Sequence, residues 1–429
     1  MELQLEKIFI KEVKFGQENR IANGVLTINR EGLLEKVRDD HRIACLDLEI
    51  VRPGDDVRIM PVKDVIEPRC KISGGEMFPG FTGDDDTVGS GITRVLSGAA
   101  VVTTGKVVGF QEGIIDMQGP GADYTPFSRT INIVITCEVK EGVKQHVHEE
   151  VLRLLGLTAA NYIGEAAREA EQEVEEVRKY EHKPLLEACS LNGGLPIVGY
   201  VYMLQSQGLL HDTYVYGVDA KEILPTLISP TEVMDGAIVS GNCVSACDKN
   251  TTYFHQNNPI IEELYEKHGR DLNFVGVIIT NENVTLADKE RSSSFTARLA
   301  EKIGLEAAIV SEEGFGNPDA DLIMNCRKLE ERGVRTVLVT DEFAGRDGAS
   351  QSLADSAPEA DAVISSGNAN EVIELPALGR VIGHDRYADS IAGGFSGSLK
   401  DDGSIEVELQ AIIGATNELG FNRLTAREF

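Results

Sequence analysis

The chain has 429 residues, of which 42% are hydrophobic and 26% are charged, and its formal net charge is −29 at pH 7. This composition is ordinary for a folded protein with a sizeable core, but the acidic balance argues against nucleic acid and anionic membranes as partners, because both need a basic surface. No apolar stretch reaches the roughly 18 residues of a membrane span, and the amino terminus lacks a signal peptide. We therefore expect a cytoplasmic protein whose seven scattered cysteines are reduced thiols.

Residues 1–141 are predicted to form a β-rich N-terminal domain. Branched and aliphatic residues recur there in runs of strand length, for example at 42–51 and 131–139. A glycine-rich stretch between these runs contains Asp84, Asp85 and Asp86. Because no spaced set of oxygen ligands follows these acids, we interpret them as a solvated loop and predict no bound metal.

The hydrophobic period becomes helical after residue 141, and a long helical segment is predicted to form a connector over 142–190. Residues 159–180 keep a helical spacing among dense glutamates and arginines, which predicts one long helix or two helices joined near Gly156. His146 and His148 lie two residues apart at its start. They therefore point to different faces of the helix, and we interpret them as surface residues instead of a metal-binding pair.

Residues 191–429 alternate between apolar strands and amphipathic helices. The apolar runs lie at 196–204, 274–280, 307–311, 336–340 and 362–365. Such continuous runs are typical of strands buried on both faces of a sheet, and helical periods over 286–303 and 317–332 separate the later ones. We predict an α/β domain with a parallel, Rossmann-like sheet, joined through the helical segment to the β-rich domain.

Polar residues follow the predicted strands at their carboxyl ends. They are Asn281, Glu282, Asn283, Ser311, Glu312, Glu313, Asp341, Glu342, Ser365, Ser366 and Asn368. Ligands gather at this edge of an open parallel sheet. Most such acids cap helices, and we select Glu312 and Asp341 as candidate substrate-pocket residues.

A cysteine stands on a predicted loop directly after the short strand 237–240, where Gly241 and Asn242 break the apolar run. The thiolate of Cys243 can attack the carbonyl carbon of Asn242 and convert the amide into a thioester. Elimination across the Cys243 side chain and hydrolysis of the resulting imine then leave a second chain that begins with a pyruvoyl group. Its ketone can capture an amine as a Schiff base. For an isolated Asn-Cys pair, a structural loop cysteine is the commoner outcome.

The longer run 241–259, GNCVSACDKNTTYFHQNNP, closely resembles the cleavage region of the pyruvoyl-forming proprotein of component B in glycine, sarcosine and betaine reductases. The resemblance extends over the whole chain, with further landmarks at 88–91, 96–102, 340–342 and 382–385, and a proline reductase proprotein is a more distant relative. It implies an oxidoreductase of anaerobic amino acid catabolism, cleaved between Asn242 and Cys243 into chains 1–242 and 243–429. The pyruvoyl group derived from Cys243 is then its covalent cofactor.

The resemblance also implies partners. A small amino acid of the glycine type binds to the ketone as a Schiff base, and a selenol or thiol attacks its α-carbon while the amine leaves. This chain contains no selenocysteine, so we expect a hetero-oligomer with a selenocysteine-containing subunit of component B and a further selenoprotein that accepts the carboxymethyl group. A thiol with a pKa near 8.5 is only slightly ionised at neutral pH, so neighbouring groups are expected to assist Cys243. The candidates are Cys247, Asp248, Lys249 and His255.

Three alternatives stay open on the sequence alone. Spacing does not choose between glycine, sarcosine and betaine, although the quaternary nitrogen of betaine cannot form a Schiff base, and glycine is the default. Asn242 can instead close to a succinimide, which leaves an ordinary cysteine at the start of the second chain. The chain can also be an uncleaved α/β binding protein in which Cys243 and Cys247 are structural.

Overall fold

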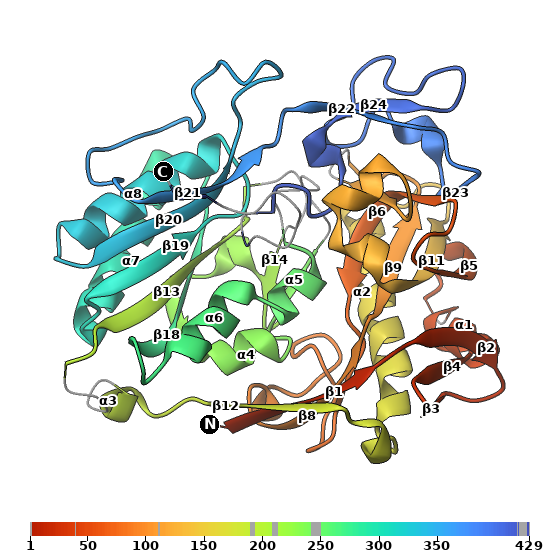
Figure 1. Cartoon of the computed structure of the whole chain (residues 1–429), viewed down its shortest axis with the longest axis horizontal. Helices are drawn as coiled ribbons and strands as arrows, with labels where there is room; N and C mark the ends of the chain where they lie inside the picture. The colour runs from red at the N-terminus through yellow and green to blue at the C-terminus, as the bar shows by residue number, and fades with distance from the viewer. Residues whose placement is uncertain are drawn as a thin grey trace.

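The computed structural model describes residues 2–38, 40–109, 112–188, 194–207, 213–241, 250–417, 419 and 427–428. The segment 242–249, which contains the bond predicted to be cleaved, is called the junction. It lies outside these ranges, and Gly241 and Asn250 are the described residues on either side of it. The chain has a mixed α/β fold with several sheets. Figure 1 shows a largely parallel sheet on one side of the molecule and a β-rich region around a long helix on the other.

Three sheets among the described residues form most of the β-rich region. A six-stranded sheet has the order β10-β6-β9-β11-β5, with β23 beside β6; its strands are β5 (Ile43–Val51), β6 (Val57–Ile66), β9 (Ala99–Gly105), β10 (Gly113–Asp116), β11 (Ile131–Val139) and β23 (Arg380–Gly383). A four-stranded sheet has the order β12-β1-β8-β7, formed by β1 (Glu2–Phe9), β7 (Arg69–Lys71), β8 (Gly91–Ser97) and β12 (Glu176–Glu181). A small sheet contains β2 (Glu12–Gly16), β3 (Arg20–Ala22) and β4 (Val25–Asn29). The predicted strands at 42–51 and 131–139 are thus confirmed.

Helix α2 (Gln145–Gly164) packs with α1 (Arg30–Arg38) against the six-stranded sheet, and their apolar side chains share one core. The helix continues through Gly156. The absence of a side chain there lets the helix pack closely against β6, because a Cβ at this position would lie 3.0 Å from Ile66 Cδ1. Near the start of the helix, His146 is exposed but His148 is buried, and burial lowers the pKa of His148 to about 4. The prediction that both histidines lie on the surface is therefore wrong for His148.

The predicted continuation of this helix to residue 180 is wrong. The α-helix ends at Gly164, two short 3-10 turns follow, and 176–181 forms strand β12, which pairs antiparallel with β1. The burial of β12 changes with a period near two, so Val177 is exposed while Tyr180 is buried. Dense charges on both sides hid this period in the sequence, because glutamate and arginine also suit the surface of a helix.

A seven-stranded sheet forms the other side of the molecule, in the order β16-β18-β13-β19-β20-β21-β25. Its strands are β13 (Ile197–Leu204), β16 (Thr226–Ile228), β18 (Asn273–Asn281), β19 (Ala307–Ser311), β20 (Arg335–Glu342), β21 (Val363–Asn368) and β25 (Arg427–Glu428). The five strands from β18 to β21 are parallel, whereas β16 and β25 are antiparallel to their neighbours. The prediction of a mostly parallel sheet is confirmed, and the two antiparallel edges are additions to it.

Helices cover both faces of this sheet. Val201 and Met203 on β13 share a core with α7 (Leu286–Ile303) and α8 (Asn317–Glu330). Tyr200, Tyr202 and Leu204 point to the opposite face and share a core with α4 (Pro230–Met234) and α6 (Pro259–Lys267). This alternation along one strand explains the unbroken apolar run in the sequence, because both faces are buried.

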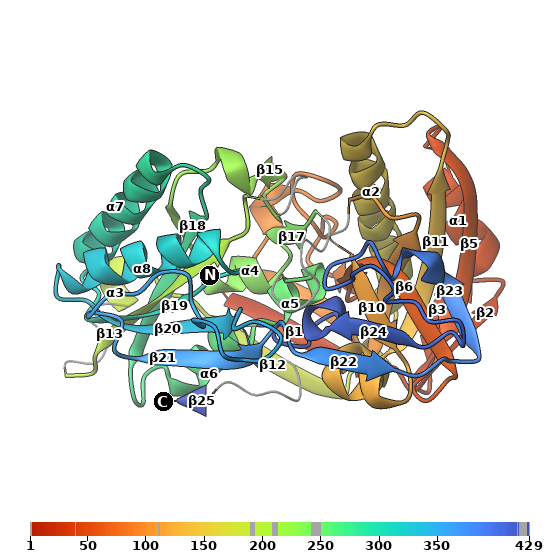
Figure 2. The same ribbon diagram turned by 90° about the horizontal axis from the view of Figure 1, so that it is seen from above.

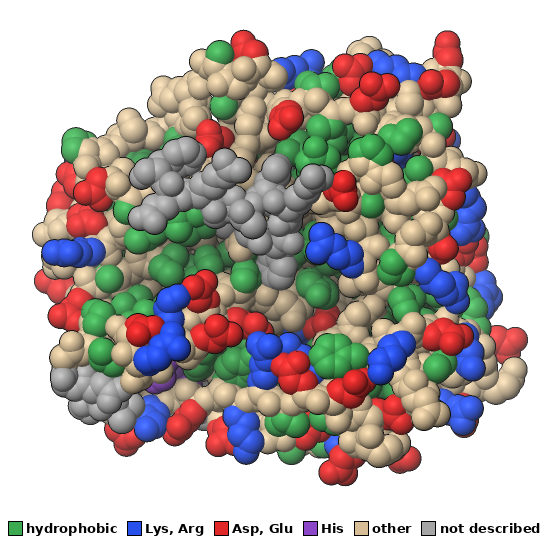
Figure 3. All heavy atoms as spheres, in the orientation of Figure 1, with side chains coloured by type: hydrophobic (Ala, Val, Ile, Leu, Met, Phe, Trp, Pro, Cys, Tyr) green, Lys and Arg blue, Asp and Glu red, His purple; other side chains and the backbone are tan. Residues whose placement is uncertain are grey.

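On the face of α6, the sheet leaves an apolar groove of about 470 Å³. The groove is lined mainly by aliphatic residues of α6 and of strands β19, β20 and β21, among them Ile260, Leu264, Ile309, Val339 and Ile364. In the orientation of Figure 3, hydrophobic side chains gather on the side of the molecule that the parallel sheet occupies, while acidic and basic side chains are mixed over the rest.

The remaining strands connect the two regions. A three-stranded sheet contains β14 (Thr213–Val215), β15 (Val218–Asp219) and β17 (Ile238–Ser240), so the predicted strand before the junction is present. Short helices α3 (Leu185–Ala188) and α5 (Thr252–Gln256) lie before β13 and after the junction. None of the described helices is long and apolar enough to cross a membrane.

The segment that carries β22 (Val372–Leu375), β23 and β24 (Ile405–Glu408) returns to the β-rich region. Strand β23 pairs parallel with β6, and β22 pairs with β24. Figures 1 and 2 both show these blue segments beside the β-rich strands. Segments from both ends of the sequence therefore build this region, while the predicted domain boundaries at residues 141 and 190 stay a prediction.

Candidate functional site

The carboxyl ends of β13 and β19 meet where the strand order of the parallel sheet reverses. The chain passes from β13 to β18 on one side and then crosses to β19 on the other. In open parallel sheets, such a switch point forms the crevice in which ligands bind. Gln205 follows β13 and Glu313 follows β19, and Gln205 N donates a hydrogen bond of 2.7 Å to Glu313 Oε2. The two strand ends are thus joined at the switch point.

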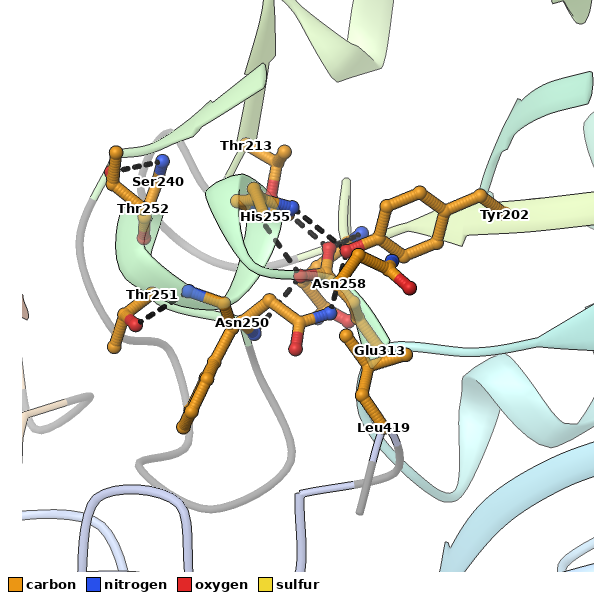
Figure 4. A network of polar contacts seen from close by, with 12 residues as sticks. Tyr202, Thr213, Ser240, Asn250, Thr251, Thr252, His255, Asn258, Glu313 and Leu419 are labelled. Atoms are coloured by element: carbon orange, nitrogen blue, oxygen red, sulfur yellow. Dashed lines mark hydrogen bonds and ion pairs between the residues drawn. The ribbon is translucent and has the colours of Figure 1, made fainter. Parts of the chain in front are cut away.

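Glu313 is fully buried and accepts hydrogen bonds from further segments. Thr213 Oγ1, at the start of β14, donates to Oε2 over 3.1 Å, and Asn250 N donates to Oε1 over 3.0 Å. His255 Nε2 lies 3.7 Å from the same Oε1. Figure 4 shows these side chains converging on Glu313. Because Asn250 is the first described residue after the junction, Glu313 ties that part of the chain to the switch point.

His255 lies on α5 with both ring nitrogens in polar contact. Its Nδ1 is 2.8 Å from Tyr202 Oη, and Asn250 Nδ2 donates to the same Oη over 2.9 Å. Because Tyr202 Oη accepts from Asn250, its own proton can be donated to His255 Nδ1, which leaves the Nε2 proton facing Glu313. The arrangement Asn250–Tyr202–His255–Glu313 is a buried polar chain that begins directly beside the junction (Figure 4).

The two chain segments that flank the junction are also joined to each other. Ser240 N, at the end of β17, donates to Thr252 Oγ1 over 3.0 Å, and this hydroxyl donates to Asp64 Oδ2 over 2.6 Å. Asp64 Oδ1 accepts from Thr252 N over 2.9 Å. All three residues are buried, and Asp64 comes from β6 in the β-rich region. The described residues that flank the junction therefore lie where the two regions of the molecule meet.

The two residues predicted for the substrate pocket lie at the ends of adjacent strands. Glu312 follows β19 and accepts a hydrogen bond from Thr340 Oγ1. Asp341 is the second-last residue of β20, and its Oδ2 accepts from Thr416 Oγ1 over 3.2 Å. Both acids are almost fully buried. The structure brings them to the same sheet edge as Glu313, and their contact with a substrate stays a prediction.

Further acids at this edge influence one another. Glu282 follows β18, and its Oε1 accepts from Glu313 N over 2.8 Å. Burial raises the pKa of Glu282 well above its ordinary value, and the neighbouring carboxyl groups of Glu312, Glu313 and Asp321 raise it further. Burial also raises the pKa of Asp321 to about 6, although its ion pair with Lys289 acts in the opposite direction. Among the described residues, no group of three or more His, Cys, Asp or Glu side chains is arranged to hold a metal ion.

Of the predicted catalytic and assisting residues, only His255 lies within the described ranges. Asn242, Cys243, Cys247, Asp248 and Lys249 lie outside the described residues. Sequence reasoning did not select Tyr202, Asn250, Thr252 or Asp64. For Asp64 a weak signal existed, because it is a charged residue within the otherwise largely apolar run 57–66, as are Arg58 and Lys63. Tyr202 had no such signal, since a tyrosine in an apolar strand is usually a core residue.

The family of the chain follows from comparison with known proteins. A family model described as glycine/sarcosine/betaine reductase component B subunits matches residues 1–427. The chain belongs to this family. The resemblance carried by the run 241–259 is therefore confirmed, and membership gives the protein an oxidoreductase role within an amino acid reductase complex that has further protein components.

Individual relatives agree with this assignment. The chain is 63% identical over 432 residues to the glycine reductase complex component B subunits alpha and beta of Acetoanaerobium sticklandii, with all of both chains covered. It is 54% identical over 428 residues to the sarcosine reductase complex component B subunit alpha of Peptoclostridium acidaminophilum, again over all of both. The D-proline reductase proprotein of A. sticklandii is 25% identical over 358 residues, which span 78% of this chain and 54% of that protein. No solved structure matches the chain.

Proposed function

We propose that this chain is the proprotein of the substrate-activating subunits of a selenium-dependent glycine reductase. The observation that carries the proposal is the full-length match to a relative whose single polypeptide bears two subunit names, alpha and beta. One chain that yields two subunits must be cut, and a distant relative is itself named a proprotein. Glycine is preferred over sarcosine because the identity to the glycine reductase relative is 63%, against 54% to the sarcosine reductase relative.

The proposed cut lies between Asn242 and Cys243. The Cys243 thiolate forms a bond to the carbonyl carbon of Asn242, and the amide bond to the Cys243 nitrogen breaks, which gives a thioester and a free amine. Elimination then breaks the Cβ–S bond of Cys243, so the sulfur leaves with chain 1–242 as a thiocarboxylate. Water hydrolyses the resulting imine at the start of chain 243–429 and releases ammonia, which leaves a ketone. The process needs a base that takes the thiol proton.

His255 is the described residue best suited to this proton transfer. It is buried three residues after Thr252, between Tyr202 and Glu313, and a nearby carboxyl group stabilises an imidazolium. Tyr202 Oη, 2.8 Å from His255 Nδ1, can give its proton to this nitrogen and take up another, which passes a proton to His255 without bulk water. Cys247, Asp248 and Lys249 stay candidates for the same assistance, because they lie outside the described residues.

When formed, the pyruvoyl group supplies a ketone that condenses with the substrate amine and draws electrons from its C–N bond. The described residues suit such a group, because the chain on both sides of the junction is held by buried hydrogen bonds, through Ser240 before it and through Asn250 after it. Glu312 and Asp341 orient the small amino acid there. A selenocysteine-containing partner subunit supplies the nucleophile, and a further selenoprotein accepts the carboxymethyl group.

The strand order also favours the predicted fold class. Numbered along the chain, the five parallel strands β13, β18, β19, β20 and β21 lie in the order 2-1-3-4-5. This is the order of the flavodoxin-like group of doubly wound folds, the class to which we assign this sheet. Strand β13 precedes the junction but lies between β18 and β19, which follow it. A cut at residue 242 therefore leaves two interlocked chains, which we expect to co-elute in size-exclusion chromatography until denaturant is added.

Intact mass spectrometry of native purified protein tests the proposal, with hydrazide labelling for carbonyl groups. We expect two masses, for chains 1–242 and 243–429, with the label on the second chain, and a single unlabelled mass for Cys243→Ala. Cys45→Ala is the matched control, because Cys45 is exposed and far along the chain from the junction. Two unlabelled chains would point to cleavage through an Asn242 succinimide. A single unlabelled chain in active wild-type protein would contradict the proposal and favour an uncleaved binding protein.

A further inference from the structure

Asp64 belongs to β6 in the β-rich region, yet its carboxyl group contacts the chain just after the junction. Its side chain accepts both the N–H and the hydroxyl proton of Thr252, over 2.9 and 2.6 Å, and the residue is 4% exposed. Two hydrogen bonds to one residue fix the position of Thr252 and the rotation of its hydroxyl group. Because the hydroxyl proton points to Asp64, the oxygen lone pairs stay available to another donor.

That donor is Ser240 N, 3.0 Å from Thr252 Oγ1. Ser240 ends the last strand before the junction, and Thr252 begins the first helix after it. A single hydroxyl group therefore joins both sides of the junction at its base, where Ser240 and Thr252 have no exposed surface. Hydrogen bonds in such a dry environment hold their geometry better than bonds in water.

The far end of the same helix is bound independently. Glu67 N donates to Gln256 Oε1 over 3.0 Å, and Gln256 Nε2 donates to Glu67 O over 3.2 Å. Helix α5 is thus attached at both ends to one stretch of the β-rich region, and His255 lies between these attachments. The attachment at Thr252 also includes Ser240, at the end of the strand before the junction, whereas the side-chain bonds of Gln256 to Glu67 do not. The Gln256 attachment therefore provides a natural control for the docking of the helix.

We propose that Asp64 and Thr252 are positioning residues for the self-cleavage of this chain, an inference that rests on the proposed function. An attack within one chain is fast when the ends of the reacting segment are fixed, because fewer unproductive conformations compete. Asp64 orients the Thr252 hydroxyl, and this hydroxyl holds Ser240, so the strand before the junction and the helix after it keep one relative position. Both residues act through the strand before the junction and the helix after it, and not on the reacting atoms.

Cleavage of the full chain during cell-free synthesis, followed over time by gel and intact mass, tests the inference with two opposed variants. Thr252→Val keeps the shape of the side chain and loses the hydroxyl group, whereas Thr252→Ser keeps the hydroxyl group and loses the methyl group. We expect cleavage of Thr252→Val to be slower by about tenfold to a hundredfold, and that of Thr252→Ser to stay within about threefold of wild type. A role in packing alone predicts the opposite order of the two variants. The inference is overturned if Thr252→Val is cleaved as fast as wild type or Thr252→Ser is as slow as Thr252→Val.

Gln256→Ala removes both hydrogen bonds at the far end of α5 but leaves the Ser240–Thr252 bond in place, so we expect near-normal cleavage. Folding is checked by thermal unfolding of each variant in a Cys243→Ala background. If Thr252→Val does not fold, Asp64→Asn is tested in its place, because the asparagine amide can accept only one of the two hydrogen bonds from Thr252. Slowed cleavage of this variant supports the inference, and unchanged cleavage overturns it. Wild type that is never cleaved refutes the proposed function, whereas cleaved wild type with unaffected variants refutes only the positioning role.

Discussion

Charged groups are buried in both regions of the molecule, but their partners differ. In the β-rich region, buried acids are matched by buried bases, as in Arg58–Asp116 at 2.7 Å and Lys63–Glu112 at 2.8 Å. At the carboxyl edge of the parallel sheet, Glu313 is instead held by backbone amides, a hydroxyl group and His255. In the first arrangement each acid lies against a base, whereas in the second, burial and then the neighbouring acids raise the pKa of Glu282 well above its ordinary value.

This difference separates a structural from a chemical use of buried charge. A matched ion pair holds its geometry but has little reason to change protonation state. Groups whose pKa values are shifted by burial and by neighbouring charges, as in Glu282, gather at functional sites. The described residues after the junction are anchored to the second kind of environment through Asn250 and to the β-rich region through Asp64. The three substitutions below test this comparison.

The largest effect is expected from Arg58→Met in the β-rich region. Arg58 makes two hydrogen bonds to Asp116, of 2.7 and 2.8 Å, and a third to Pro376 O. Removal of the base leaves Asp116 buried without this cation, so the free energy of unfolding should fall by about 3–5 kcal/mol. Denaturant titration of the variant measures this loss. Arg129→Met, at an exposed position, should change it by less than about 0.5 kcal/mol. A loss below about 1 kcal/mol for Arg58→Met would mean that the pair is not a structural element.

A smaller loss of stability is expected from Glu313→Gln at the sheet edge. The glutamine amide keeps one acceptor oxygen, so one set of donors, either Asn250 N or the pair Gln205 N and Thr213 Oγ1, then faces an NH₂ group. An unsatisfied buried donor costs about 1–3 kcal/mol, which denaturant titration resolves. Cleavage at the junction should slow as well, because Asn250 loses its anchor. Glu331→Gln, at an exposed position near the end of α8, is the control for both measurements, and equal behaviour of the two variants would contradict a role for Glu313.

Local patterns in the sequence predicted much of the fold. Helix α7 was predicted over the residues it occupies, because its apolar stripe and its boundaries are encoded within the segment. Strand β12 was missed because its pairing partner, β1, lies far from it in the sequence. Strand β23 was not predicted either, since its pairing with β6 joins distant parts of the chain. Local patterns therefore predict a helix or strand where its signal lies within the segment, whereas a strand that depends on a partner far away in the sequence is missed.

The candidate site divides in the same way. The polar residues after each strand predicted that acids meet at one edge, and Glu312 and Asp341 lie there. The contacts that anchor the junction depend on partners far apart in the chain, as in Asp64 with Thr252 and Tyr202 with His255. No spacing rule connects such pairs. The sequence therefore predicted which strand ends carry the site, and the structure adds the residues that hold it together.

The smallest effect, and the most specific, concerns the pH dependence of stability in Glu282→Gln. The raised pKa of Glu282 means that the folded protein retains its proton above pH 4.3, the approximate pKa of glutamate in an unfolded chain. The folded state then binds more protons than the unfolded state, so this residue makes stability fall as the pH rises above that value. Glutamine cannot ionise, and the variant should lose this part of the pH dependence. Its stability relative to wild type should therefore improve steadily from pH 4.5 towards pH 8.

Denaturant titrations of both proteins across this pH range measure the difference, with Glu31→Gln at an exposed position as the control. A curve for Glu282→Gln parallel to that of wild type would show that Glu282 is ionised in the folded protein. The acids at the sheet edge would then be balanced by neighbouring groups, as they are in the β-rich region, and the contrast between the two regions would disappear. A widening gap in favour of the variant instead locates retained protons at the edge that anchors the junction.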